Sequence, residues 1–238
     1  MPEDDDTIRE GLASLFLWWY GSTPPIMTCL RRGWRSEGHL AASQESELLP
    51  AELDRAWRQR WFAKDDRTAK VDRYAREQFE GLLNEVSSWR LLEADVERLP
   101  LWERLALIIL LDQLPRSIYR GTPMAYSYDS TALPLALAIA QDEGAIASLP
   151  LHFLSTVFIC ICHSEAMEHQ ELLKQRLRSS AFTRRYRTGS TAAIASALDE
   201  IQRKHLMRCS LFGRFPERNA VLGRSSTEAE SAWLQQLS

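Results

Sequence analysis

The chain has 238 residues, of which 45% are hydrophobic and 26% are charged, and its formal net charge is −3 at pH 7. This composition is typical of a soluble globular protein, and the negative net charge argues against a protein that binds nucleic acid through many cations. No apolar run is long enough to span a membrane, and the four cysteines lack the CxxC spacing of zinc and redox motifs. We therefore expect a single cytoplasmic domain over residues 1–238, with neither a membrane nor a nucleic-acid partner.

Apolar residues recur at helical spacing from Ile8 to Trp19, with Thr7 and Glu10 placed as a capping box and Gly21 placed to end the helix. Residues 22–49 are rich in proline, glycine and serine and show no period, which predicts a loop insertion. Further helices are expected at residues 53–61 and 71–86, packed on each other, and at residues 91–99.

The centre of the fold is predicted at Leu105–Gln113, which opens with seven consecutive apolar residues and becomes polar at Asp112. A helix with so few polar residues has no solvated face, so we expect it to be buried. Pro115 disfavours helical geometry at Leu114, so the helix should end or kink there.

The second half of the chain also shows helical spacing. Asp129 or Ser130 can cap a helix that ends near Gly144; a buried helix is expected over residues 151–161 and a more polar one up to about residue 178. Residues 191–213 predict one more helix, and a capping box of Thr227 and Glu230 predicts a last short helix that carries Trp233 and Leu234. No segment shows sustained strand-type alternation, so the predicted fold class is all-α, with about eight to ten helices around one central buried helix.

Polar side chains follow the central helix at its carboxyl end. Asp112, Arg116 and Arg120 are spaced four residues apart, which would place them on one side of an unbroken helix. They predict either a structural ion-pair network, with Asp112 supporting the arginines, or a site for an anion, because guanidinium groups suit carboxylate and phosphate.

A second polar group, His163-Ser164-Glu165, follows the buried helix at residues 151–161, with Gln170 farther along the next helix. A histidine and a carboxylate could transfer protons near neutral pH if the chain bends so that they converge. The alternative interpretation is a buried histidine satisfied by a core hydrogen bond, and His205 is expected to be one. No histidine has the ligand spacing of a metal site, so neither a metal nor another cofactor is expected.

Five segments together carry a family resemblance: LFLWWYG, RWFAKDDR, LALIILLDQLPRSIYRGTPMAY, CHSEAMEHQ and FGRFPERNAVLGRSST. In this order they resemble the DUF924 family of uncharacterised bacterial and fungal proteins over nearly the whole chain. The resemblance implies a tetratricopeptide-like all-α fold and supplies no agreed activity. Ser117, Ala166 and Glu217 depart from the residues usual in the family. If ordinary members share a reaction, these departures would abolish or redirect it.

The sequence thus predicts a small-molecule-binding protein, and more specifically an enzyme acting on an anionic or polar metabolite. The catalytic candidates are His163 and Glu165, and the ligand-binding candidates are Asp112, Gln113, Arg116, Arg120, Gln170, Arg214, Arg218, Asn219 and Arg224. One alternative is a tetratricopeptide-like scaffold that binds peptides in an open groove. Another is an accessory enzyme of secondary metabolism that shapes a hydrophobic substrate between aromatic walls. An enzyme should gather His163, Glu165, Arg116 and Arg218 around one cavity.

Overall fold

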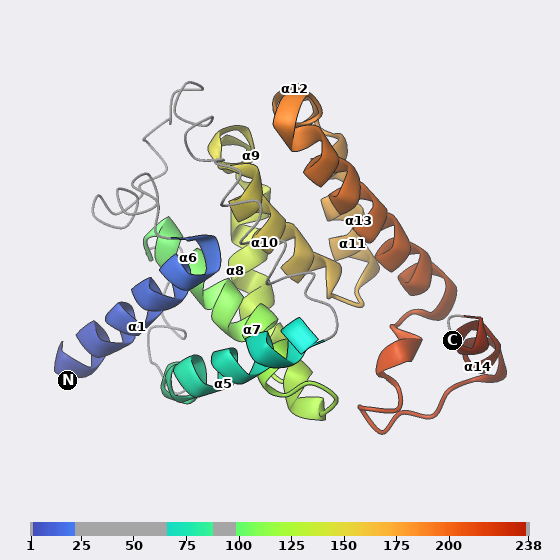
Figure 1. Ribbon diagram of the computed structural model, residues 1–238. Coiled ribbons are helices and arrows are strands. Elements are labelled where there is room, and N and C mark those ends of the chain that lie inside the picture. Colours follow the sequence, from blue (N-terminus) through green and yellow to red (C-terminus); the bar gives the residue numbers. More distant parts are fainter. Residues whose placement is uncertain (1, 22–65, 88–98, 237–238) are drawn as a thin grey trace.

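The computed structural model describes residues 2–21, 66–87 and 99–236, and every regular element in these ranges is a helix (Figure 1). The all-α array predicted from the sequence is therefore confirmed. The predicted insertion at residues 22–49, the helix at residues 53–61 and all but the last residue of the helix at residues 91–99 lie outside the described residues.

The α-helices are, in chain order, α1 (Pro2–Tyr20), α5 (Asp66–Ser87), α6 (Leu101–Ile108), α7 (Leu114–Ile118), α8 (Asp129–Gln141), α9 (Glu143–Ser148), α10 (Leu151–Cys162), α11 (Met167–Arg178), α12 (Ser180–Tyr186), α13 (Ala192–Phe212) and α14 (Glu228–Gln235). A π-helical turn, η3 (Ile109–Gln113), joins α6 to α7. Short 3-10 helices lie at η4 (Pro123–Tyr126), η5 (Gly189–Thr191) and η6 (Pro216–Arg218). None of the helices described is both long enough and apolar enough to cross a membrane.

Helix α1 begins at Pro2, so Thr7 lies inside the helix and the capping box predicted at Thr7 and Glu10 is wrong. Proline suits the first turn of a helix. Gly21, at φ 91°, follows the helix as predicted. Helix α1 packs against α5 and α6.

The central helix is buried as predicted, but it does not end at Leu114. Leu114 has helical dihedrals (φ −66°, ψ −38°), and its amide donates to the carbonyl of Ile109, five residues earlier. This wider turn carries the chain past Pro115, which has no amide hydrogen to donate, and α7 continues to Ile118. The predicted break is therefore replaced by a π turn at the place where the helix becomes polar.

Helix α10 is buried along its whole length and packs against α6, α8, α11 and α13. Two of its polar members have hydrogen-bond partners inside the protein: the Ser155 hydroxyl donates to the Leu151 carbonyl (2.7 Å), and the Thr156 hydroxyl lies 2.6 Å from the Tyr20 hydroxyl. The helix ends at Cys162, so the polar residues that follow start where the core ends.

Helix α8 also departs from its predicted limits. Its N-cap is Tyr128, and Asp129 is the first helical residue, whose carboxylate binds arginines instead of capping the helix. The helix ends at Gln141, before Gly144, because Asp142 caps α9 by accepting hydrogen bonds from the amides of Gly144 and Ala145.

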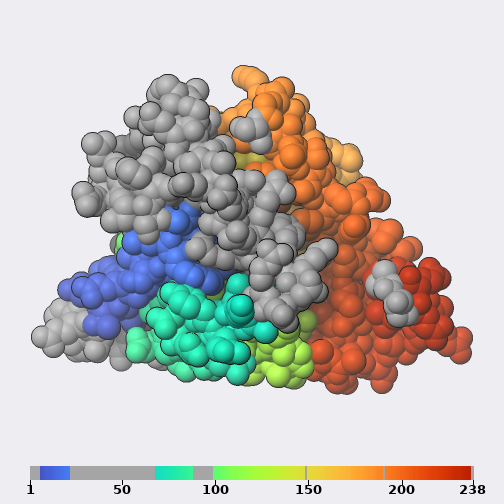
Figure 2. Space-filling model, in the orientation of Figure 1, coloured from blue at the N-terminus to red at the C-terminus, as the bar shows by residue number. Residues whose placement is uncertain are grey.

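The carboxyl-terminal segment folds back over the polar ends of these helices. Gly213 adopts the left-handed conformation (φ 67°) and ends α13 as predicted, and the capping box of Thr227 and Glu230 at α14 is confirmed. In Figure 2, the surface of the segment that follows α7 (lime) lies beside the surface of the carboxyl-terminal segment (red). The two meet where Arg218 stacks on the ring of Tyr126.

Candidate functional site

A cavity of about 230 Å³ lies between the start of α8, the end of α10 and the carboxyl-terminal segment. Its wall is formed by Asp129, Ser130, Leu133, Cys160, His163, Ser164, Glu165, Arg218 and Leu222. Three of the four residues expected to share a cavity, His163, Glu165 and Arg218, lie on this wall, and Arg116 is connected to it through Asp129.

His163 and Asp112 form a largely buried polar pair at the site. Nδ1 of His163 lies 3.0 Å from both carboxylate oxygens of Asp112, which is only 1% exposed. A carboxylate accepts hydrogen bonds, so Nδ1 carries the proton and Nε2 has a free lone pair. Nothing in the described residues hydrogen-bonds to Nε2. It is therefore the ring nitrogen available to a ligand.

Burial, helped by nearby arginines, keeps the imidazole of His163 neutral. Burial, followed by the Arg116 guanidinium, lowers the pKa of His163 to about 4, against the opposing effect of Asp112. Burial alone would raise the pKa of Asp112, but Arg116 and His163 outweigh it and hold that pKa below its ordinary value. At neutral pH the pair is thus a carboxylate and a neutral imidazole that can accept a proton.

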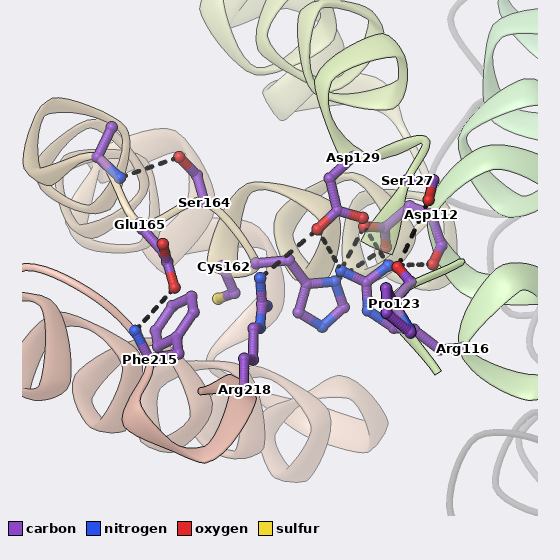
Figure 3. A network of polar contacts seen from close by, with 12 residues as sticks. Asp112, Arg116, Pro123, Ser127, Asp129, Cys162, Ser164, Glu165, Phe215 and Arg218 are labelled. Atoms are coloured by element: carbon purple, nitrogen blue, oxygen red, sulfur yellow. Dashed lines mark hydrogen bonds and ion pairs between the residues drawn. The ribbon is translucent and has the colours of Figure 1, made fainter. Parts of the chain in front are cut away.

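Arg116 connects two carboxylates from different helices (Figure 3). Its Nη1 lies 3.1 Å from Oδ1 of Asp112, and its Nη2 donates to Oδ2 of Asp129 at 2.8 Å. The predicted contact between Asp112 and Arg116 is present, and the π turn that precedes Arg116 does not prevent it. Asp112 holds the histidine as well as the arginine.

Arg218 approaches Asp129 from the carboxyl-terminal segment. Its Nη1 lies 3.5 Å from Oδ2 of Asp129, and its guanidinium lies over the rings of Tyr126 (4.8 Å) and Phe215 (4.5 Å). Burial, with Arg116 nearby, lowers the pKa of Arg218. Two arginines from segments that are far apart in the sequence thus share one carboxylate, Asp129.

Glu165 lies on the cavity wall but is already paired. Arg224 donates to both of its carboxylate oxygens (3.0 and 3.1 Å), and the amide of Phe215 donates to Oε1 (2.9 Å). Burial acts to raise the pKa of Glu165, but these partners outweigh it and lower the pKa. The carboxylate partner of His163 is Asp112, and Glu165 instead attaches the carboxyl-terminal segment to the end of α10.

Ser164 is held by both its backbone and its side chain. Its carbonyl accepts from Nε2 of Gln170 (2.7 Å), while its hydroxyl accepts from the Ala166 amide (3.2 Å) and lies 2.8 Å from Nδ1 of His169. Gln170, which was predicted as a ligand-binding residue, is fully buried and fixes the chain between α10 and α11.

Other predicted site residues have structural partners. Gln113 donates to Asp112 from within the buried helix. Arg120 does not line the cavity described above; it pairs with Asp72 of α5 through two hydrogen bonds of 2.6 and 2.9 Å. The expected alignment of Arg120 with Asp112 and Arg116 is therefore wrong, because α7 ends at Ile118, before Arg120.

In the carboxyl-terminal segment, Arg214 donates to Glu230 (2.6 Å) and Asn219 donates to Ser226 (3.0 Å). Both hold α14 and the loop before it. His205 makes one hydrogen bond, as expected, with Nδ1 2.8 Å from the Ile201 carbonyl, but it is only partly buried, and its ring contacts His163 edge-on.

The sequence interpretation missed Asp129, Tyr126 and Cys160. Asp129 was interpreted as a helix cap. Nothing in the sequence indicated that its side chain would contact Arg116, 13 positions earlier, and Arg218, 89 positions later. Burial raises the pKa of the Cys160 thiol well above its usual range, so the thiol is not a ready nucleophile. Within the described ranges, no group of three or more histidine, cysteine, aspartate and glutamate residues is placed to hold a metal ion.

Comparison with known proteins supports the fold. A family model described as a bacterial protein of unknown function, DUF924, matches residues 31–238. A solved structure of a protein of unknown function, ATU0120 from Agrobacterium tumefaciens, is similar at a TM-score of 0.57 and 25% identity, over 82% of this chain and 98% of that chain. No curated protein matches the chain.

Proposed function

This chain belongs to the DUF924 family of bacterial proteins of unknown function, and from that premise we propose that it is an enzyme that binds a small anionic or polar metabolite and abstracts a proton from it. Nε2 of His163 is the proposed base. Asp112 fixes the tautomer and stabilises the imidazolium that forms. Arg218 and Arg116 orient the metabolite through its polar or negatively charged group.

One observation carries this proposal: Nδ1 of His163 is bound to a buried carboxylate, while Nε2 has no partner on the wall of a cavity. A histidine with a purely structural role would be expected to use both ring nitrogens or to be closed off from space that a ligand could enter. A cavity of about 230 Å³ is small, which favours a metabolite over a peptide.

With His163 as the proposed base, the roles predicted for Glu165 and Asp112 change. Glu165, predicted to act with His163, becomes a positioning residue, because its oxygens are bound by Arg224 and Phe215. Asp112, predicted to support the arginines, also supports the base. The peptide-binding scaffold and the accessory enzyme that shapes a hydrophobic substrate stay predictions.

The test is a screen of small acids and other polar metabolites for thermal stabilisation and for proton exchange at carbon in deuterated water. Wild type and His163→Gln should both be stabilised by the same compound, but only wild type should exchange the substrate proton; loss of the base typically lowers the rate about a hundredfold to ten-thousandfold. Exchange at the wild-type rate in His163→Gln would remove His163 from the reaction. His205→Gln, altered at the neighbouring histidine, is the matched control.

The pair of Ser164 and His169 supports a second candidate function, acyl transfer. Because the Ala166 amide donates to the serine oxygen, the hydroxyl proton is free to point at Nδ1 of His169, as in an activated nucleophile. A fluorophosphonate probe followed by peptide mass spectrometry tests this function. Labelling of Ser164 in wild type that disappears in His169→Gln would support acyl transfer, and an unlabelled wild type would exclude this nucleophile.

A further inference from the structure

We infer that the cavity contains a carboxylate subsite between Arg116 and Arg218, which the side chain of Asp129 occupies here and which a carboxylate of the ligand takes over on binding. The inference rests on the proposed function, and it narrows the ligand to a carboxylic acid. The carboxylate of Asp129 thus takes the place of the ligand carboxylate.

The position of Asp129 shows what the subsite accepts. Oδ2 accepts from Arg116 at 2.8 Å and lies 3.5 Å from Nη1 of Arg218, whereas Oδ1 is buried and has no hydrogen-bond partner in the described residues. A carboxylate offers about four lone-pair positions, so this one is only partly satisfied. A ligand carboxylate free to choose its orientation could present one oxygen to each arginine.

The two arginines are held without the help of Asp129. Arg116 donates to the backbone carbonyl of Asp112 and lies 3.1 Å from its carboxylate. Arg218 lies over the rings of Tyr126 and Phe215. Both guanidinium groups should therefore stay in place when Asp129 withdraws.

Asp129 is also free to withdraw. It is the first residue of α8, its side chain makes no capping hydrogen bond, and 26% of that side chain is exposed. A change of side-chain rotamer would move the carboxylate towards water, where its charge is hydrated. Burial raises the pKa of Asp129 against the effect of Arg116, so the contacts that this side chain makes with the arginines do not fully compensate for its burial.

Charge balance favours a single negative charge in the subsite. Two arginines, Arg116 and Arg218, face two carboxylates, Asp112 and Asp129, around a neutral His163. Replacing the carboxylate of Asp129 by that of a ligand keeps this balance, whereas a phosphate dianion would add an uncompensated charge at a site with little exposure to water.

The test measures binding of acetate and benzoate by calorimetry and ligand-observed NMR, with acetamide and inorganic phosphate as comparison probes. In Asp129→Asn the side chain keeps its size and loses its charge. We expect this variant to bind both carboxylates about tenfold more tightly than wild type, the scale of one charge-assisted hydrogen bond. Acetamide should bind no more tightly, and phosphate should gain less than acetate.

Three matched variants make the result specific. Asp129→Glu keeps the charge and should show no gain. Asp72→Asn frees Arg120, an exposed arginine outside the cavity, and should also show no gain. Adding Arg218→Gln to Asp129→Asn should abolish the gain.

The proposal of a carboxylate subsite would be refuted if wild type and Asp129→Asn bound the carboxylates equally tightly. It would also be refuted if Asp72→Asn gained as much carboxylate affinity as Asp129→Asn. If Asp129→Asn fails to fold by circular dichroism, Asp129→Ser carries the same expectation. The experiments test the subsite and the general base separately. The gain in carboxylate affinity requires no proton transfer, so it should persist when His163→Gln is added to Asp129→Asn. A gain in carboxylate affinity without His163-dependent proton exchange would support the subsite and refute His163 as the base. Proton exchange that depends on His163 without a gain in affinity would support the base and refute the subsite.

Discussion

Asp112 serves two groups from different helices, and this sharing determines what its removal should do. Its carboxylate lies 3.0 Å from Nδ1 of His163 and 3.1 Å from Nη1 of Arg116, and it is almost completely buried. We expect Asp112→Ala to lower the free energy of unfolding by about 3–5 kcal/mol, because it leaves the largely buried Arg116 with only one of its two carboxylate partners and Nδ1 of His163 without its acceptor. Urea denaturation at neutral pH measures this change.

Asp72→Ala is the control for that measurement. It removes an aspartate that also pairs with an arginine, but Arg120 is more than half exposed. The expected loss there is at most about 1 kcal/mol, since water screens an exposed pair. Equal losses in the two variants would show that Asp112 contributes no more than a surface ion pair.

His163 and His205 should make the stability of the protein depend on pH. Burial is the main cause that lowers the pKa of each to about 4, from an ordinary value of 6.5. Between these values the unfolded chain binds more protons than the folded protein, so stability falls as the pH decreases from about 6.5 to about 4. Each histidine contributes a loss of about 3 kcal/mol over this window.

A comparison of variants separates the effect of the two histidines on pH-dependent stability from the effects of other titrating groups. Asp129 and Glu103, whose pKa values are raised by burial, act in the opposite direction in the acid range. We therefore compare unfolding free energies of wild type and of the double variant His163→Gln, His205→Gln at pH 7 and at pH 5. Wild type should lose more stability than the variant between these two values. A parallel loss would show that these imidazoles are not responsible.

At the scale of single elements, the π turn at Ile109–Gln113 is the feature that sequence patterns could not predict. A run of apolar residues suits an α turn and a π turn equally, and Pro115 signals only that one backbone donor is missing. Burial of Leu105–Gln113 was predictable because it follows from the absence of a polar face. The type of turn depends on how the whole helix fits between its neighbours.

The segment between α13 and α14 is a second element, and Glu165 of the loop after α10 contributes polar contacts to its position. Glu165 binds the amide of Phe215 and the guanidinium of Arg224, and this segment carries Arg218 to the cavity. We expect Glu165→Ala to increase amide hydrogen exchange at Phe215 by about tenfold, since a hydrogen bond to a charged acceptor is lost. Exchange in α10 should not change.

Glu171→Ala provides the control for this exchange experiment. Glu171 lies on α11 in a half-buried pair with Lys174, and within the described residues it makes no hydrogen bond or ion pair with the segment after α13. Its removal should leave the exchange of Phe215 unchanged. If exchange at Phe215 rises equally in both variants, or in neither, Glu165 does not attach this segment.

At the scale of the whole molecule, the sequence indicated which residue types collect at helix ends but not which of them meet. His163 was predicted to act with Glu165, two residues away, and its partner is Asp112, 51 positions earlier. Arg116 and Arg218 were both predicted, whereas Asp129, which they share, was not. Spacing rules apply within one helix, and these pairs depend on how α8, α10 and the carboxyl-terminal segment pack.

That packing joins nearly all described helices into one hydrophobic core. The core cluster runs from Ile8 in α1 to Leu198 in α13, and α10 contacts four other helices within it. A chain whose parts share one core cannot lose one part without exposing the rest. We therefore expect a single cooperative unfolding transition, consistent with the prediction of one domain over residues 1–238.

Differential scanning calorimetry and denaturation followed by two probes test this expectation. The ratio of van't Hoff to calorimetric enthalpy should be about 1. Tryptophan fluorescence, which reports Trp18, Trp19 and Trp102 near α1 and α6 among other tryptophans, should change at the same denaturant concentration as the helical signal in circular dichroism. Leu154→Ala, in the middle of α10, should lower both midpoints together, because it leaves a cavity in the shared core. Midpoints that separate in wild type, or that Leu154→Ala shifts for one probe alone, would mean that the helices form two independently folding units.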